Sequence, residues 1–303
     1  MEERYRGRFP SQLSKGQWLD EDRWLSQDGG EETYFLPLKE ESKIALQNQC
    51  AAVEHNNHAV LLLKQGCYLE ALEWLTRALQ FCRKAMVIAP MQRLVESNTA
   101  NIPRTLDAYL GQEPFFPVKS DQEDERPYYN HLVRIPCIVV DSSYRTSVLL
   151  STLVTFNFSL VNHVLGLLML NQCSCNNANH NTAISTSMTT THLQVAAKSY
   201  QLAYEMQHAE GFTHNNLFES AVLNNLGLLH SQIGNYPAAD TCWEHLWRLV
   251  RENIHTEESQ QDGVTTSPAP QLNRNATTTR HYYHRFWRNL STWLSQSTSA
   301  AAA

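Results

Sequence analysis

Two stretches of the chain arrange apolar and polar positions with the spacing of paired helices. Residues 56–79 read NNHAVLLLKQGCYLEALEWLTRAL, and residues 224–246 read NNLGLLHSQIGNYPAADTCWEHL. Each begins with two asparagines and an apolar run, then has a glycine, an aromatic residue two positions later and an alanine three positions after that. Apolar residues at helical spacing on both sides of a glycine predict a helix, a tight turn and a second helix folded back on the first.

A third, less regular pair of helices is predicted between these two stretches. Residues 157–159 (NFS) align with residues 225–227 (NLG), and the first helix of this pair continues to Leu170. The second helix, at 193–206, keeps a spacing of alanine, aromatic and alanine. The polar segment 171–191 separates the two helices and is too poor in apolar residues to order itself, so we predict that it is an inserted loop.

Composition indicates where the helical region begins and ends. Residues 1–40 are polar and predict an N-terminal arm, and the helical domain is predicted at 41–253. Within it, residues 88–130 contain five prolines and an acidic run, which predict a second inserted loop. Residues 128–140 are richer in β-branched and aromatic residues, and they predict a short β segment interrupted by a proline.

Two further segments follow the helical domain. Residues 254–280 are rich in Ser, Thr, Gln and Pro, and they predict a low-complexity linker. Residues 281–295 place aromatic side chains at helical spacing and predict a C-terminal helix. This helix has two interpretations: it shields the exposed face of the last hairpin, or it docks on a partner or a membrane surface.

An uncharged apolar stretch at 148–170 raises the question of a membrane. Its length suffices to cross a bilayer. Asn157, Asn162 and His163 would then lie near the middle of the membrane, where polar groups are costly. The alternative is a helix buried between neighbouring helices of one domain. We favour the buried helix and keep a single-pass membrane-anchored adaptor as the alternative.

The hairpins resemble the tetratricopeptide repeat (TPR), a unit of antiparallel helices about 34 residues long. The resemblance implies an all-α fold of about three hairpins, which are not in tandem here because Gly66 and Gly234 lie far apart in the sequence. It also implies noncovalent binding of another protein as the function. The positions that carry the resemblance are Ala59, Gly66, Tyr68, Ala71 and Ala78 in the first hairpin, and Gly227, Gly234, Tyr236 and Ala239 in the last.

By the same resemblance, certain positions of each first helix line a groove for the partner. In this chain they include Asn56, Val60, Lys64, Asn224, Leu228 and Gln232. Asparagine amides can bond the backbone of an extended peptide, or they can satisfy hydrogen bonds between helices. Both interpretations remain open. A grip on a terminal carboxylate needs several cations, and Lys64 alone is available among these groove positions, so we do not expect it.

Other chemistries find little support in the sequence. Cys173, Cys175, His180 and His192 lie in or beside the polar insertion and lack the regular spacing of zinc ligands, so we expect no metal and no cofactor. The chain carries no GxSxG, HExxH or glycine-rich phosphate loop, so we expect no enzyme, although an enzyme of unfamiliar type is a third alternative.

Charge and cysteine usage bear on partners and compartment. The net charge is −6 and basic residues are scattered, so no nucleic acid is expected as a partner. The N-terminal MEERYRGRFP is charged and precedes no apolar segment, so we expect no secretory signal. Together with an odd number of cysteines, seven, this favours the cytoplasm, with the nucleus as a second possibility.

Overall fold

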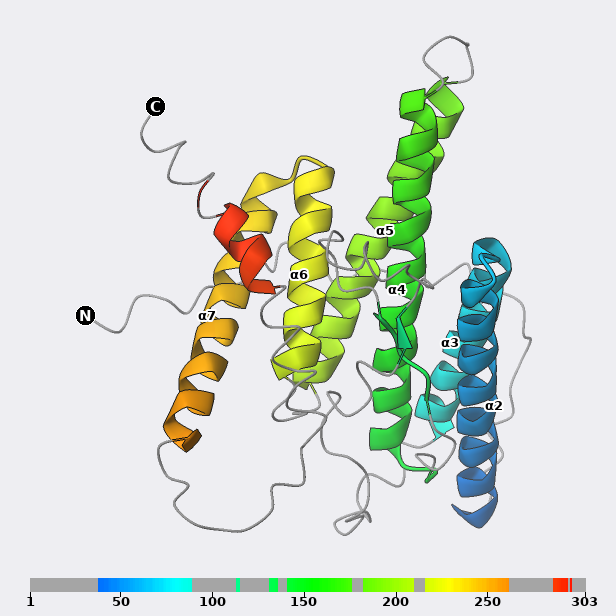
Figure 1. Cartoon of the computed structure of the whole chain (residues 1–303). Helices are drawn as coiled ribbons and strands as arrows, with labels where there is room; N and C mark the ends of the chain where they lie inside the picture. The colour runs from blue at the N-terminus through cyan, green and yellow to red at the C-terminus, as the bar shows by residue number, and fades with distance from the viewer. Residues whose placement is uncertain are drawn as a thin grey trace. The chain divides into compact units, whose positions relative to one another are not determined.

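Three antiparallel helix pairs follow one another along the chain (Figure 1). The computed structural model describes residues 38–88, 113–114, 131–135, 141–175, 182–209, 216–261, 286–293 and 295. The pairs are α2 (Leu38–Lys64) with α3 (Tyr68–Ile88), α4 (Tyr144–Cys175) with α5 (Thr182–Ala209), and α6 (Asn216–Gln232) with α7 (Tyr236–Gln261). The described residues are almost entirely helical, so the predicted all-α fold class is confirmed.

The same turn joins the helices of the first and last pairs. Gly66 and Gly234 have φ angles of 79° and 76°, in the left-handed region that glycine adopts without steric cost. In the first turn, the N–H of Cys67 donates to the Leu62 carbonyl and that of Gly66 to the Leu63 carbonyl, both at 3.0 Å. The last turn repeats both bonds from Asn235 and Gly234. This Schellman motif ends each first helix and reverses the chain within three residues.

Small residues allow the paired helices to approach closely. Ala59, Ala71 and Ala78 are fully buried in the first pair. In the last pair Ala239 is buried, and Gly227 lies against the indole of Trp243, where an added Cβ would be 2.8 Å from the ring. The two aromatic residues that follow the turns are less buried: Tyr68 is half-buried, and Tyr236 is exposed.

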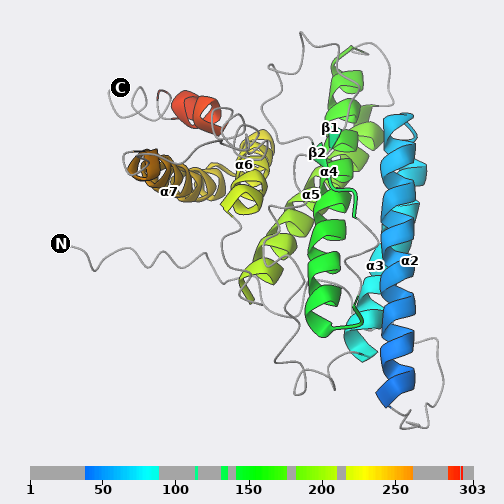
Figure 2. The same ribbon diagram turned by 60° about the horizontal axis from the view of Figure 1, so that its bottom comes forward.

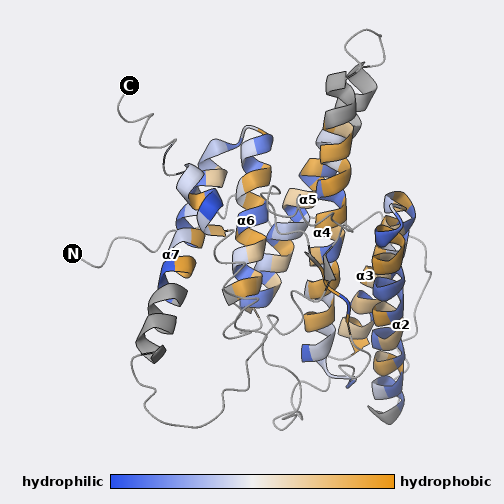
Figure 3. Ribbon diagram, in the orientation of Figure 1, coloured by the Kyte–Doolittle hydropathy of each residue, from blue (hydrophilic) through white to orange (hydrophobic). Residues whose placement is uncertain are grey.

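Helix α4 lies at the centre of the described fold. Nearly every side chain from Thr146 to Leu165 is buried. Helices α3 and α5 pack along it, and its Phe156 ring meets Tyr200 of α5 and Phe218 of α6 at centroid distances of 5.8 and 5.3 Å. Figure 3 shows apolar residues along most of α4, whereas α2 and α7 also carry hydrophilic ones.

The polar side chains of α4 are accommodated by hydrogen bonds. Thr152, Ser159 and Asn162 each donate to the carbonyl four residues earlier in the same helix, at 2.7 to 2.9 Å. Such bonds satisfy a buried hydroxyl or amide without a charged partner. Among the described residues, Tyr144–Leu170 is the one helix long and apolar enough to cross a membrane, and 72% of its most apolar window is buried inside the structure.

Several predicted boundaries are corrected by the helices. The inserted loop predicted at 171–191 is helical at both ends, because α4 continues to Cys175 and α5 begins at Thr182. These polar residues continue helices that are already packed against each other, so local composition does not decide their structure. Helix α7 likewise extends to Gln261, into the predicted linker at 254–280.

The remaining predicted segments are described in part. The N-terminal arm at 1–40 lies outside the described residues up to its last three, with which α2 begins. Of the predicted loop at 88–130, Ile88 ends α3 and strand β1 (Glu113–Pro114) is described. It pairs antiparallel with β2 (His131–Leu132), so the predicted β segment near 128–140 contains a strand of two residues.

A short C-terminal helix at 286–293 packs against α6 and α7 (Figure 2). Phe286 and Leu290 are buried, and the Asn289 amide donates to Asn224 Oδ1 on α6 at 2.7 Å. Trp293 Nε1 donates to Asp240 on α7 at 2.8 Å. The helix therefore takes the shielding position on the last hairpin, the first of its two interpretations.

We predict that Gly227→Ala destabilises the protein by about 1–3 kcal/mol, because the new methyl group must displace the buried Trp243 indole. The free energy of unfolding in urea measures this change. Intrinsic helix propensity acts in the opposite direction and favours alanine by roughly 1 kcal/mol. An increase in stability would therefore contradict the close approach of α6 and α7.

Candidate functional site

An extended segment of the chain lies across α2 and α4. It comprises residues 131–135 and begins as strand β2. Val133 and Ile135 are fully buried, whereas Arg134 between them is exposed. In an extended chain, alternate residues face the same way. Val133 and Ile135 therefore share the side that faces the helices, while on the opposite side Arg134 is exposed and Leu132 is buried.

Two asparagines hold the backbone of this segment, each by a pair of hydrogen bonds. Asn157 of α4 accepts the N–H of Val133 and donates to its carbonyl, both at 2.8 Å. Asn57 of α2 does the same for Ile135, at 2.9 and 2.7 Å. A carboxamide carries one donor group and one acceptor, as a peptide group does, so each asparagine acts as a short neighbouring strand.

A third asparagine joins these two. Asn56 donates to the Val133 carbonyl at 3.0 Å and accepts from the Asn157 amide at 2.8 Å. Asn56 and Asn157 are fully buried. We call Asn56, Asn57 and Asn157 the asparagine clamp. Because its members are neutral, their burial avoids the large desolvation cost of ions, and every bond that they make to the segment is to backbone.

The clamp defines what this surface can bind. Its hydrogen bonds are made to an extended backbone, so they do not depend on which side chains the segment carries. Selectivity comes from packing, since the three buried side chains of the segment, Leu132, Val133 and Ile135, are all apolar. The arrangement is a noncovalent grip on an extended, mostly apolar segment.

Six groove residues were predicted from the sequence, and they lie in different environments in the structure. Asn56 lies in the clamp, where it bonds an extended segment of its own chain and a neighbouring helix, while contact with a partner stays a prediction. Val60 is buried, and Lys64 is exposed at the end of α2. On α6, Asn224 is buried and Leu228 is half-buried, while the exposed Gln232 accepts from His163 Nε2 at 3.2 Å.

Two clamp members were missed as site residues. Asn57 and Asn157 were recognised as positions of the repeat, but they were not predicted to hold the segment. A signal was available in the sequence, because both asparagines share one place in the repeat. Each lies two positions before a small residue, Ala59 or Ser159. The segment that they bind was predicted only as a short β segment interrupted by a proline.

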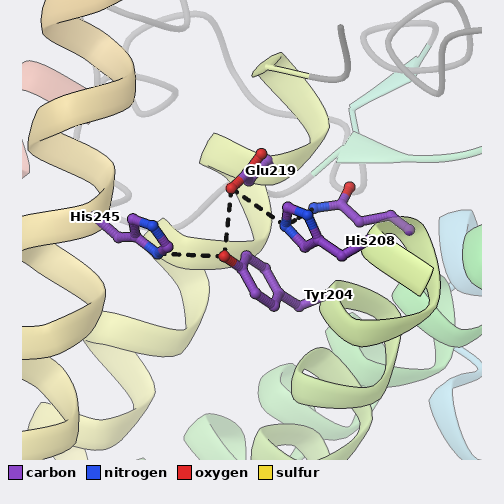
Figure 4. Close-up of polar contacts among 5 residues, drawn as sticks. Tyr204, His208, Glu219 and His245 are labelled. Atoms are coloured by element: carbon purple, nitrogen blue, oxygen red, sulfur yellow. Dashed lines mark hydrogen bonds and ion pairs between the residues drawn. The ribbon is translucent and has the colours of Figure 1, made fainter. Parts of the chain in front are cut away.

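A second polar cluster joins α5, α6 and α7 (Figure 4). The hydroxyl of Tyr204 lies 3.4 Å from Glu219 Oε1 and 3.2 Å from His245 Nδ1, and His208 Nε2 lies 3.4 Å from the same carboxylate oxygen. Burial, followed by the adjacent Glu219 carboxylate, raises the pKa of Tyr204, so its hydroxyl stays protonated. Burial lowers the pKa of His245. We interpret this neutral phenol and imidazole beside one carboxylate as a connection between the last two hairpins.

Metal-binding geometry is absent from the part of the chain that the structure describes, where no group of three His, Cys, Asp or Glu side chains could hold an ion. The side chains of Cys173, Cys175 and His180 lie outside the described residues. His192, which was considered with them, bonds Asn162 Oδ1 through Nδ1 at 2.9 Å.

Comparison with known proteins gives no relative for this arrangement. No protein-family model matches the chain, and neither the curated proteins nor the solved structures contain a match. Function must therefore be inferred from the clamp and the helices that carry it.

We predict that Asn157→Leu destabilises the protein by about 3 kcal/mol, because it removes the side-chain oxygen that accepts the Val133 N–H in a buried site. Urea unfolding measures the loss. The matched control is Asn48→Leu on α2, whose amide donates to the Ile44 carbonyl of its own helix at 2.9 Å. A control that costs as much as Asn157→Leu would contradict the role of the clamp.

We predict that stability falls with pH through the buried His163. Burial lowers the pKa of this imidazole to about 4 from its ordinary 6.5, against a weaker opposite effect of its hydrogen bond with Gln232. Between these pH values the unfolded chain binds a proton here and the folded chain does not. The free energy of unfolding should thus decrease by about 3 kcal/mol as the pH falls through that window. His163→Gln should show a shallower decrease, and an identical pH dependence would refute this assignment.

Proposed function

We propose that this protein is a noncovalent protein-binding scaffold built from TPR-like helical hairpins. The observation that carries the proposal is the asparagine clamp, in which the first helices of two successive hairpins grip an extended backbone. A surface that binds its own extended segment in this manner has the chemistry required for a partner's segment.

Charge and polarity support a protein as the partner. The clamp is neutral, and the chain has a net charge of −6, which disfavours nucleic acid. Amide side chains match the donor and acceptor of a peptide group. The proposal includes a cytoplasmic location and no catalytic step.

The TPR-like part of the proposal is supported by details of both outer hairpins. Each turns at a left-handed glycine, and each buries small residues where its helices meet. The first helices, α2, α4 and α6, carry asparagine at the same register: Asn57, Asn157 and Asn225. A repeated unit that presents the same polar side chain from successive helices favours binding of an extended ligand along the stack.

The alternative of a membrane-anchored adaptor fits the contacts of α4 less well. Insertion of the stretch at 148–170 would separate Asn157 from the extended segment and His163 from Gln232. Unpaired amides and imidazoles are costly in hydrocarbon. We therefore keep the scaffold as the proposed function.

Site-specific photo-cross-linking in native lysate tests the proposal. A benzoylphenylalanine at Lys64 or at Leu228, both groove positions, should cross-link to the same partner polypeptide. The matched control is Gln80, an exposed residue on the second helix of the first hairpin, and it should give no adduct with that partner. Equal labelling from all three positions, or no partner at either groove position, would contradict the proposed function.

A further inference from the structure

A row of paired aromatic and cationic side chains runs along the second helix of the first hairpin. We call Trp74, Arg77, Phe81 and Lys84 of α3 the aromatic–cation row. The Arg77 guanidinium lies over the Trp74 ring, 5.1 Å from its centroid, and Lys84 Nζ lies 5.6 Å from the centroid of the Phe81 ring. Both cations are exposed and both rings are half-buried. The same pair of an aromatic residue and a cation three positions later therefore occurs twice, seven residues apart, on one face of the helix.

Helix α2, which lies beside α3 (Figure 1), holds the two rings in place. The His55 ring contacts both of them, with centroid distances of 4.9 Å to Trp74 and 5.0 Å to Phe81, and its Nδ1 donates to the Ala51 carbonyl at 2.8 Å. The His58 ring lies 4.3 Å from Trp74. Because the rings are fixed between the two helices, the cations above them lose side-chain freedom before any ligand binds, which lowers the entropic cost of binding.

The two cations of the row have no ion pair within the part of the chain that the structure describes, since no carboxylate there lies within ion-pair distance of Arg77 or Lys84. From Trp74 to its end at Ile88, α3 carries three basic residues and no acidic one, although the whole chain has a net charge of −6. A locally positive, exposed surface of this kind is complementary to the carboxylates of another molecule.

A single strand of nucleic acid also binds basic and aromatic side chains, but its bases need open ring faces on which to stack. In the row, Arg77 lies over the face of Trp74 and Lys84 lies over the face of Phe81. The row therefore offers positive charge without a stacking surface. This arrangement favours an acidic protein segment over a nucleic-acid strand.

The spacing of the cations selects a helical ligand. Seven residues of an α-helix span about 10 Å, so carboxylates seven residues apart on a ligand helix match the spacing of Arg77 and Lys84 along α3. In an extended segment, residues that share a face are about 7 or about 13 Å apart, and neither spacing matches. Val87 lies one turn beyond Lys84 and is 70% exposed, so an apolar residue of the same ligand helix can pack against it.

We propose that the aromatic–cation row is a docking surface for an acidic amphipathic helix of a partner protein. Two carboxylates of that helix, at positions i and i+7, pair with Arg77 and Lys84, and its apolar residues cover Val87 and the exposed edges of the two rings. This inference goes beyond the proposed function, because α3 carries none of the groove positions. The ligand helix belongs to a protein other than the one that binds the groove.

Fluorescence anisotropy of a labelled synthetic peptide with the full-length chain tests the docking surface. The peptide is an alanine-based helix with two glutamates seven residues apart and leucines on the same face. It should bind saturably with a Kd below about 1 mM, and the double variant Arg77→Gln/Lys84→Gln should weaken binding roughly tenfold. A peptide of the same composition, whose glutamates are five residues apart and so lie on different faces, should bind the wild-type chain roughly threefold more weakly or worse.

Arg83→Gln is the matched control. Arg83 is an exposed cation of the same helix, and it lies over no aromatic ring within the described residues. This variant removes the same charge as Lys84→Gln but leaves the row intact, so it should change the affinity less than Lys84→Gln does. All three substituted positions are exposed, and urea unfolding should confirm that each variant folds as the wild-type chain does.

Equal affinity for the two peptides, equal effects of Lys84→Gln and Arg83→Gln, or no binding at about 1 mM peptide would overturn the docking surface. A labelled oligouridine that binds the wild-type chain and loses affinity in Arg77→Gln/Lys84→Gln would overturn it in favour of nucleic acid. The scaffold function is tested separately by the cross-links from Lys64 and Leu228, so either proposal can fail while the other stands.

Discussion

A buried amide must have its donors and acceptor satisfied, and this requirement governs the centre of the molecule. Helix α4 is buried almost all around, yet it carries hydroxyl, amide and imidazole groups along its length. Its short polar side chains donate hydrogen bonds to backbone carbonyls of the same helix. Asn157 and His163 reach beyond it, to an extended segment and to α6, and so they fix which surfaces can lie against α4. A helix with only apolar side chains could pack against its neighbours in several rotations and registers.

The same requirement explains how the long uncharged stretch at 148–170 is buried inside a folded domain. Charge would have to be paired at a desolvation cost, whereas neutral amides pair with backbone at little cost. Neutral pairing also makes the clamp independent of side-chain sequence, except for the apolar character of alternate positions. The structure therefore combines strict geometry at the backbone of the bound segment with little dependence on its side chains.

Local patterns in the sequence predicted the parts of the fold that depend on local physics. Gly66 and Gly234 identified both hairpin turns, because a left-handed residue is needed there. The absence of charge at 148–170 identified the buried helix. The clamp could not be predicted from local patterns, because Asn57 and Ile135 are 78 positions apart in the sequence. The helical ends of 171–191 were missed because packing against a neighbouring helix, rather than composition, orders them.

The extended segment also changes how cooperative the stack is. Repeat proteins are ordinarily quasi-one-dimensional, so that each unit contributes its own stability and contacts only its neighbours. Here a single segment is bonded to α2 and to α4 at once, and these bonds span 24 to 78 positions of the chain. Neither of the first two hairpins can separate without stripping partners from buried amides. The two hairpins and the segment should therefore unfold together.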